Sequence, residues 1–288
     1  MSIFSLRGAP LIPAVLAAAM TAAATPAAAQ HKDAPDFAPD PATAWIPVGD
    51  AAAGFSPIPG HVAPLADDPA HPYVANGNRE GRQPTDRIAD LTNPNLKPWV
   101  KEAMKKDIDE VLAHKKLAFT PRSSCVPPGV PSFMAYGGGG NSTYFLQAPG
   151  RVWILFAGGQ ETRHVYLGVP HSANPKSSWY GESVGHYEGD TLVVDTIGQT
   201  TKTLVDPLRT PHSEKLHVVE RFTIEPSGKG MSALVTVEDP DTFNAPLTMT
   251  RRWFKFERPM LETICAENNG DFFHQNLFPQ PEAKTPDF

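Results

Sequence analysis

The chain has 288 residues, hydrophobic residues at 41% of its positions and a formal net charge of −6. Its length suits one large β domain or two small ones, and we favour a single domain. Lysine and arginine form no cluster along the sequence. Since duplex nucleic acid is bound through a basic face, a nucleic-acid-binding function is excluded.

Residues 1–29 have the features of a secretory signal peptide. One early charge, at Arg7, precedes an apolar, alanine-rich run through Ala24, and small residues follow up to Ala29, after which we place the cleavage. Prolines interrupt the run, which therefore lacks the ~20 clean apolar residues of a transmembrane helix. We expect a mature chain that is exported, either periplasmic or secreted, with no insertion into a membrane.

The stretch 30–96 holds eleven prolines between Gln30 and Pro94 and keeps no steady helical or strand period. This composition predicts an irregular arm that lies over the domain, with few helices of its own. We expect no chemistry to originate in the arm, although its position could let it cover the mouth of a pocket.

Residues 97–288 are expected to form the folded domain, which starts with one amphipathic helix over 97–115. Charged residues fill one face of this helix, and Pro98 stands where the first helical turn tolerates proline. The apolar positions at helical spacing are Val100, Met104, Ile108, Val111 and Leu112.

The only two cysteines, Cys125 and Cys265, are expected to form a disulfide, because an exported chain enters an oxidising compartment. The bond would close a loop of about 140 residues and, on the chain-entropy view, stabilise the fold by ~4–5 kcal/mol. With both thiols bonded to each other, neither would be a nucleophile or a metal ligand.

From residue 143 on, apolar and polar residues alternate between turn residues, which is typical of antiparallel strands. No βαβ alternation occurs, so a parallel sheet is disfavoured. The pattern predicts a mainly β domain: an antiparallel up-and-down barrel or a strongly curved sheet that nearly closes, with the helix packed at one end or face. The expected strands are Thr143–Gln147, Arg151–Phe156, Thr162–Leu167, Ser183–Tyr187, Thr191–Thr196, Leu216–Glu225, Met231–Glu238, Thr248–Glu257 and Leu261–Cys265.

Two glycine motifs resemble functional patterns, but neither has the neighbouring residues that the pattern requires. Gly181–Gly185 spells GxSxG, the nucleophile elbow of α/β-hydrolases, but a loop precedes it and a hairpin follows it, whereas the elbow needs a strand before Ser183 and a helix after it. We therefore disfavour Ser183 as a nucleophile. The second motif, the run Gly137–Gly140, lacks the Lys-Ser/Thr of a phosphate-binding loop, so it predicts a flexible loop.

Histidines and one carboxylate are the remaining candidates for chemistry. Five histidines lie within residues 164–217, on or beside strands that an antiparallel sheet can bring together. Glu220 interrupts an apolar face of its strand, and an inward carboxylate is costly unless it is paired. Its partner is either structural, an ion pair with Arg163 or Arg251, or belongs to a site. No spacing typical of a histidine metal site occurs, so we expect neither a metal nor a cofactor.

The segment Gly181–Thr196 resembles a family of secreted bacterial proteins with a GDSxGxWEGDTLVVDT-like signature. The resemblance implies, by analogy, a lipocalin-like or calycin-like barrel, and it assigns no activity. This chain departs from the signature with Glu182 in place of Asp and with His186-Tyr187 in place of an Arg-Trp-like pair. The other matching pieces are Cys125–Pro131, Leu216–Phe222, Val237–Pro240 and Cys265–Asn268.

Two functions fit a barrel that encloses a pocket for a small, largely apolar organic molecule. The favoured one is a cofactor-free acid–base enzyme, a lyase, dehydratase, isomerase or hydrolase, with a histidine as general base, Tyr180 as donor and Glu220 as orienter. The alternative is a periplasmic binding or carrier protein in which the same groups only bind a ligand. The oligomeric state stays open. The candidate residues are His164, Tyr180, His186, His212, His217 and Glu220.

Overall fold

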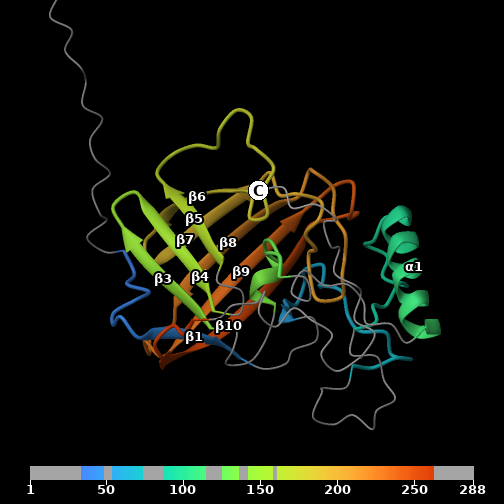
Figure 1. The fold of residues 1–288 in the computed structure, drawn as a ribbon, viewed down its shortest axis with the longest axis horizontal. Coiled ribbons are helices and arrows are strands. Elements are labelled where there is room, and N and C mark those ends of the chain that lie inside the picture. Colours follow the sequence, from blue (N-terminus) through green and yellow to red (C-terminus); the bar gives the residue numbers. More distant parts are fainter. Residues whose placement is uncertain are drawn as a thin grey trace, which may run out of the picture.

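The computed structural model describes residues 34–48, 54–73, 87–114, 125–135, 142–157 and 161–262. Its main feature is a closed barrel of nine strands, with one α-helix to its side (Figure 1). The strands of the barrel are β1 (Thr43–Pro47), β3 (Thr143–Ala148), β4 (Arg151–Phe156), β5 (Glu161–Leu167), β6 (Glu182–Glu188), β7 (Thr191–Ile197), β8 (His217–Ile224), β9 (Gly230–Glu238) and β10 (Leu247–Glu257). A short strand, β2 (Ser56–Pro57), pairs with β10 beside the closed ring.

The predicted barrel is confirmed, with one correction to its strand directions. Every barrel pairing is antiparallel except that of β5 with β6, which is parallel, with Val165 opposite Ser183. A parallel pair cannot be joined by a hairpin, and residues 168–181 carry the chain back to the other end of the sheet. We call these residues the crossover loop. The barrel is therefore mixed and not purely up-and-down.

A second correction concerns the proline-rich arm, which supplies the strand that closes the barrel. Strand β1 pairs antiparallel with β10 along its whole length and also meets β3, where Trp45 lies opposite Thr143. Both faces of β1 are buried, so its sequence has no alternation of polar and apolar residues by which it could be recognised. The rest of the described arm, apart from β2 and two isolated bridges, Asp67 with Ala89 and Leu96 with Phe243, contains no strand.

Two further predictions touch the chain beyond β10. Leu261 and Glu262 belong to no strand, and the remainder of the predicted strand to Cys265 lies outside the described residues. The disulfide between Cys125 and Cys265 therefore stays a prediction.

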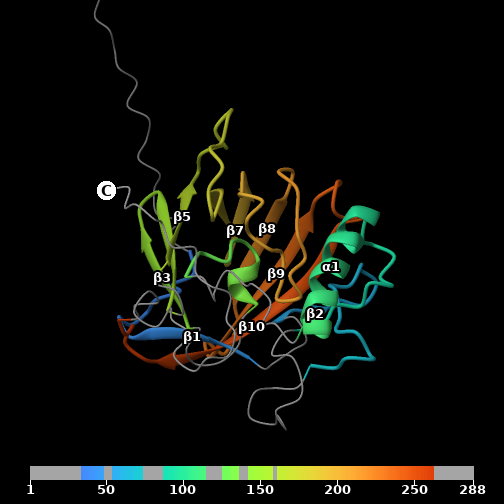
Figure 2. The same ribbon diagram turned by 45° about the vertical axis from the view of Figure 1, so that its right-hand side comes forward.

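Helix α1 (Pro98–His114) agrees with the predicted helix to within one residue at each end. Its buried residues Val100, Met104, Ile108 and Val111 are four of the five apolar positions named from the sequence. Figure 2 shows the helix outside the barrel wall. No helix among the described residues is long and apolar enough to cross a membrane.

Two polar contacts fix α1 to the loops at the end of the barrel. The indole of Trp99 donates a hydrogen bond to the backbone oxygen of Asp241 (2.6 Å), in the β9–β10 connection. Arg209, from the β7–β8 connection, donates to Asp107 of the helix (2.5 Å). The helix thus braces the loops that lie near the ends of β7, β8 and β9.

The barrel interior is filled with side chains from alternate strand positions. Phe145, Leu192, Phe222 and Trp253 are all fully or almost fully buried, as expected for inward-facing residues of a packed barrel. A short 3-10 helix, η4 (Ser132–Met134), is buried as well, and its residue Phe133 covers a guanidinium of the interior.

Candidate functional site

The GxSxG segment belongs to the barrel wall and not to a nucleophile elbow. Strand β6 runs straight through Ser183, whose side chain is buried and faces the interior. The two glycines have packing reasons: a Cβ at Gly181 would lie 2.3 Å from the backbone oxygen of Ile197, and one at Gly185 would lie 2.7 Å from that of Val193. The motif is explained by close strand contacts.

Ser183 is part of a buried polar group that we call the interior cluster: Arg163, Ser183, Thr196 and Glu220. Arg163 and Glu220 are 2% and 0% exposed and form a bidentate ion pair, with one bond of 2.9 Å. The guanidinium also donates to Ser183 (3.0 Å) and Thr196 (2.6 Å). Of the alternatives for Glu220, the structural ion pair with Arg163 is therefore the one observed.

In this arrangement Glu220 of the interior cluster is not placed to act as a general acid or base. Both carboxylate oxygens of Glu220 accept from Arg163, and the Phe133 ring lies over the guanidinium, with 5.5 Å from its carbon to the ring centroid. Tyr180 packs edge-on against Phe133, with ring centroids 6.3 Å apart. Tyr180 is thus linked to the interior cluster through Phe133.

His212 is a satisfied core histidine. Its Nδ1–H donates to the backbone oxygen of Ser213 (2.8 Å), and its Nε2 lies at hydrogen-bond distance from the hydroxyl oxygen of Thr203 (2.7 Å). Burial lowers the pKa of this imidazole, so the neutral ring is favoured.

His164 and His186 face outward on different parts of the barrel wall. His164 is exposed and packs against Trp153, with ring centroids 6.3 Å apart. His186 hydrogen-bonds Glu188 (2.9 Å), which also accepts from Arg221. The predicted residues therefore do not converge into one acid–base constellation, and the structure separates them into buried and surface groups.

One predicted histidine, His217, does belong to a larger group on the outer face of β6–β9. His217 Nε2 lies 2.9 Å from Asp195 Oδ1, and His171 Nε2 lies 3.0 Å from the same oxygen. His171 Nδ1 faces Glu182 (3.0 Å), and His217 Nδ1 lies 3.5 Å from Glu238. We call these five residues the carboxylate–histidine row.

The row alternates acid and imidazole across four strands and one loop. Each strand contributes through an outward position, and His171 reaches in from the crossover loop. The bond with Asp195 raises the pKa of the His217 imidazole, and the bond with His217 lowers the pKa of the Asp195 carboxyl. The hydroxyl of Ser172 is the main cause that lowers the pKa of Glu182. Perturbed groups that share a surface beside a pocket mark a candidate functional site.

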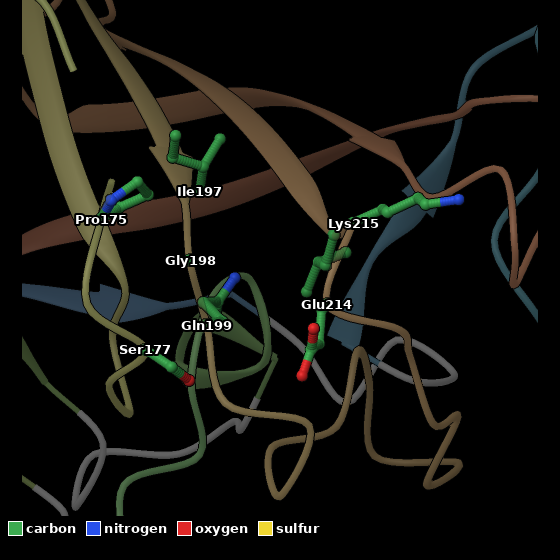
Figure 3. A pocket seen from close by; sticks show the side chains of 8 residues that line it. Pro175, Ser177, Ile197, Gly198, Gln199, Glu214 and Lys215 are labelled. Atoms are coloured by element: carbon green, nitrogen blue, oxygen red, sulfur yellow. The ribbon is translucent and has the colours of Figure 1, made fainter. Parts of the chain in front are cut away.

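A pocket of about 350 Å³ lies beside the row, at the ends of β7 and β8, and we call it the end pocket (Figure 3). Its walls come from the crossover loop, from the end of β7 and from the residues before β8. Ile197 continues the outer face of β7 beyond Asp195, and Leu216 directly precedes His217, so row and pocket share a border. The lining residues are Pro175, Ser177, Ile197, Gly198, Gln199, Glu214, Lys215 and Leu216.

Two polar side chains of the end pocket already have hydrogen-bond or ion-pair partners in the protein. The side-chain amide of Gln199 accepts from the backbone N–H of Val130 (2.6 Å), donates to the backbone oxygen of the same residue (2.9 Å) and so holds that loop in place. Lys215 extends away from Glu214 and pairs with Asp241 (3.0 Å). Ser177 and Glu214 stand on opposite walls in Figure 3. The pocket therefore offers apolar surface with a few polar contacts, as small-molecule sites do.

A second pocket, of about 370 Å³, lies at the opposite end of the row, where Glu238 is one of its lining residues together with Lys97. Among the residues that the structure describes, no group of three or more histidine, cysteine, aspartate or glutamate side chains is arranged to hold a metal ion.

Sequence reasoning missed most of the row. In the sequence, Asp195 stands near the end of a hairpin strand, where a polar residue needs no functional role, and His171 lies in a stretch with no strand pattern. Alternation does place Asp195 and His217 on the outer faces of neighbouring strands, and this signal was available. The position of His171 depends on the path of the crossover loop, which no periodicity encodes.

Comparison with known proteins finds no family model that matches the chain, no curated protein of similar sequence and no solved structure that matches it.

Proposed function

We propose that the protein is an exported small-molecule-binding protein that holds a small, largely apolar organic ligand in the end pocket. The observation that carries this proposal is the end pocket itself: its volume of about 350 Å³ suits such a ligand, and Pro175, Ile197 and Leu216 give it apolar surface beside polar side chains. The separation of the predicted acid–base residues supports binding over chemistry, because no histidine of the set lies within hydrogen-bond reach of Glu220.

The test uses three probes that stay uncharged between mildly acid and alkaline pH: cyclohexanol, benzyl alcohol and indole. Saturation-transfer NMR with the purified protein should detect at least one of them. Ser177→Trp places a large ring in the pocket and should abolish the signal. Asn174→Trp is the matched control, because Asn174 is exposed in the same loop but does not line the pocket. Equal signals from both variants, or no signal from any probe, would overturn the proposal.

A second candidate is acid–base catalysis at the carboxylate–histidine row. It is favoured by Asp195, which orients the Nε2 atoms of both His171 and His217 at the border of the end pocket. New resonances that grow during incubation with a pool of metabolites, and that His217→Gln suppresses, would support catalysis. Bound probes without new resonances support the binding function.

A further inference from the structure

The carboxylate–histidine row connects the crossover loop to the barrel at one place, and the backbone connects it at another. At the first place, His171 bonds Glu182 and Asp195, and the backbone N–H of Ser172 donates to Glu182 (2.8 Å). At the second, the Ser178 N–H donates to the backbone oxygen of Gly198 (3.1 Å). The stretch between the two attachments contains the pocket wall.

In the first attachment the two bonds of His171 depend on protons, whereas the bonds that Ser172 donates to Glu182 from its backbone N–H and its hydroxyl do not. Both ring nitrogens of His171 face carboxylate oxygens, which can only accept hydrogen bonds. Both bonds therefore form together only when the ring carries two protons and is cationic. A neutral ring keeps one N–H and turns a lone pair toward the other carboxylate, which is repulsive.

His217 has the same dependence. It lies between Asp195 and Glu238, and it shares the Asp195 oxygen with His171. With both rings cationic the row carries two positive and three negative charges, and with both neutral it carries three uncompensated carboxylates. Loss of a proton thus costs each ring one of its two links and removes the positive charge that attracts the other carboxylate.

Other charged groups near the row are few among the described residues. Lys97 lines the second pocket with Glu238, and Glu214 and Lys215 precede His217 in the end pocket. Lys215 is paired with Asp241, so it does not replace the histidines as counter-ions of the row.

From this geometry we propose that the row is a proton-operated latch: it fixes the crossover loop, and with it the wall of the end pocket, while its histidines are protonated, and it releases the loop when they lose their protons. Pro175 and Ser177 lie between the two attachments of the loop. Loss of the His171 bonds leaves this wall held by Ser172 and Ser178, so the pocket widens and loses contacts with an apolar ligand. This regulation rests on the proposed binding function of the pocket.

The direction of the pKa shifts agrees with a latch that is closed at mildly acid pH. His217 has a raised pKa, so the stabilisation from its charged form beside Asp195 is complete below the ordinary value of 6.5 and is lost only as pH rises through the higher value of the folded protein. Asp195 has a lowered pKa, so its charge persists down to below 3.8. The latch is therefore closed at pH values between the lowered pKa of Asp195 and the raised pKa of His217.

Hydrogen exchange of the full chain tests the latch without any ligand. Protection factors of the amides 171–178, corrected for the intrinsic exchange rate, should fall about three- to tenfold between pH 6 and pH 9, while those of β7 stay constant. In His171→Gln the loop should be weakly protected at both pH values. His186→Gln is the matched control, since it removes another histidine–carboxylate pair, on the same strands, that touches no loop.

Binding of the three uncharged probes then distinguishes the latch from the binding function of the end pocket. If the loop loosens with pH but neither cyclohexanol, benzyl alcohol nor indole binds, the latch stands and the binding function fails. If a probe binds in a manner that Ser177→Trp blocks, its affinity should drop by about the same three- to tenfold at pH 9. Loop protection that is equal at both pH values, or that falls equally in His171→Gln and in the natural sequence, overturns the latch.

Discussion

Strands β5–β9 carry two polar clusters on opposite faces, and the two differ in how far water can reach them. The interior cluster pairs Arg163 with Glu220 in full burial, and hydroxyl groups complete its hydrogen bonds. The carboxylate–histidine row stands on the outside, where Asp195 and His217 keep about a third of their side-chain surface exposed.

This difference in exposure to water decides which cluster can respond to a change of pH. A buried ion pair that has lost its hydration is kept together, because removal of either charge would leave the other unsolvated and unpaired. A partly exposed row exchanges protons with water at modest cost. Inward groups of this barrel therefore support the wall, and outward groups are the ones available for regulation.

The largest effect is expected when the interior pair is broken. Glu220→Leu leaves the Arg163 guanidinium buried without a counter-ion, which should lower the free energy of unfolding by about 3–5 kcal/mol. Urea denaturation measures the loss. The double variant Arg163→Met, Glu220→Leu should recover most of it, because it removes both charges. A single variant that costs less than about 1 kcal/mol would contradict the structural role of the pair.

The prediction of Glu220 as an inward carboxylate shows what a sequence can and cannot provide. Alternation along β8 placed it inside, because a strand has a fixed period and its neighbours Val218 and Phe222 are apolar. The choice between Arg163 and Arg251 as its partner depended on which strands lie two and three places away. That order includes the parallel step from β5 to β6, which depends on a crossover that has no local pattern.

The same reasoning separates the predictable parts of the fold from the rest. Eight of the nine barrel strands and the helix are predicted from their periods, whereas β1, which is buried on both faces, is not. The row was missed because His171 comes from a loop. Contacts made by irregular chain are set by the whole fold and not by neighbouring residues.

A smaller effect is expected when the outer row is broken, and this effect should depend on pH. His217→Gln removes a histidine whose pKa is raised in the folded protein. Its stabilisation is therefore complete below 6.5 and disappears as pH rises through the raised value. Since the row is partly exposed, the variant should lose no more than about 1 kcal/mol near pH 5.5 and almost nothing at alkaline pH.

Urea midpoints at the two pH values measure this difference. The Glu220→Leu variant is a natural counterpart, since the loss that it causes should be similar at both pH values. If His217→Gln lost more stability at alkaline pH than at pH 5.5, the charged imidazole of His217 would not be the stabilising form.

The smallest effect belongs to the fully exposed outer face, where Glu188 accepts from Arg221 and His186. The hydrogen bond from Arg221 is the main cause that lowers the pKa of Glu188 to about 2, and the bond with His186 adds to it. Arg221→Gln should therefore move the Glu188 titration, followed by carboxyl NMR, most of the way back toward 4.5, and His186→Gln should move it less. Neither variant should change the urea midpoint measurably, because exposed pairs stabilise a fold little. The reverse order of the two shifts would mean that the imidazole and not the guanidinium holds this carboxylate, and His186 would then resemble the histidines of the row more than its exposure suggests.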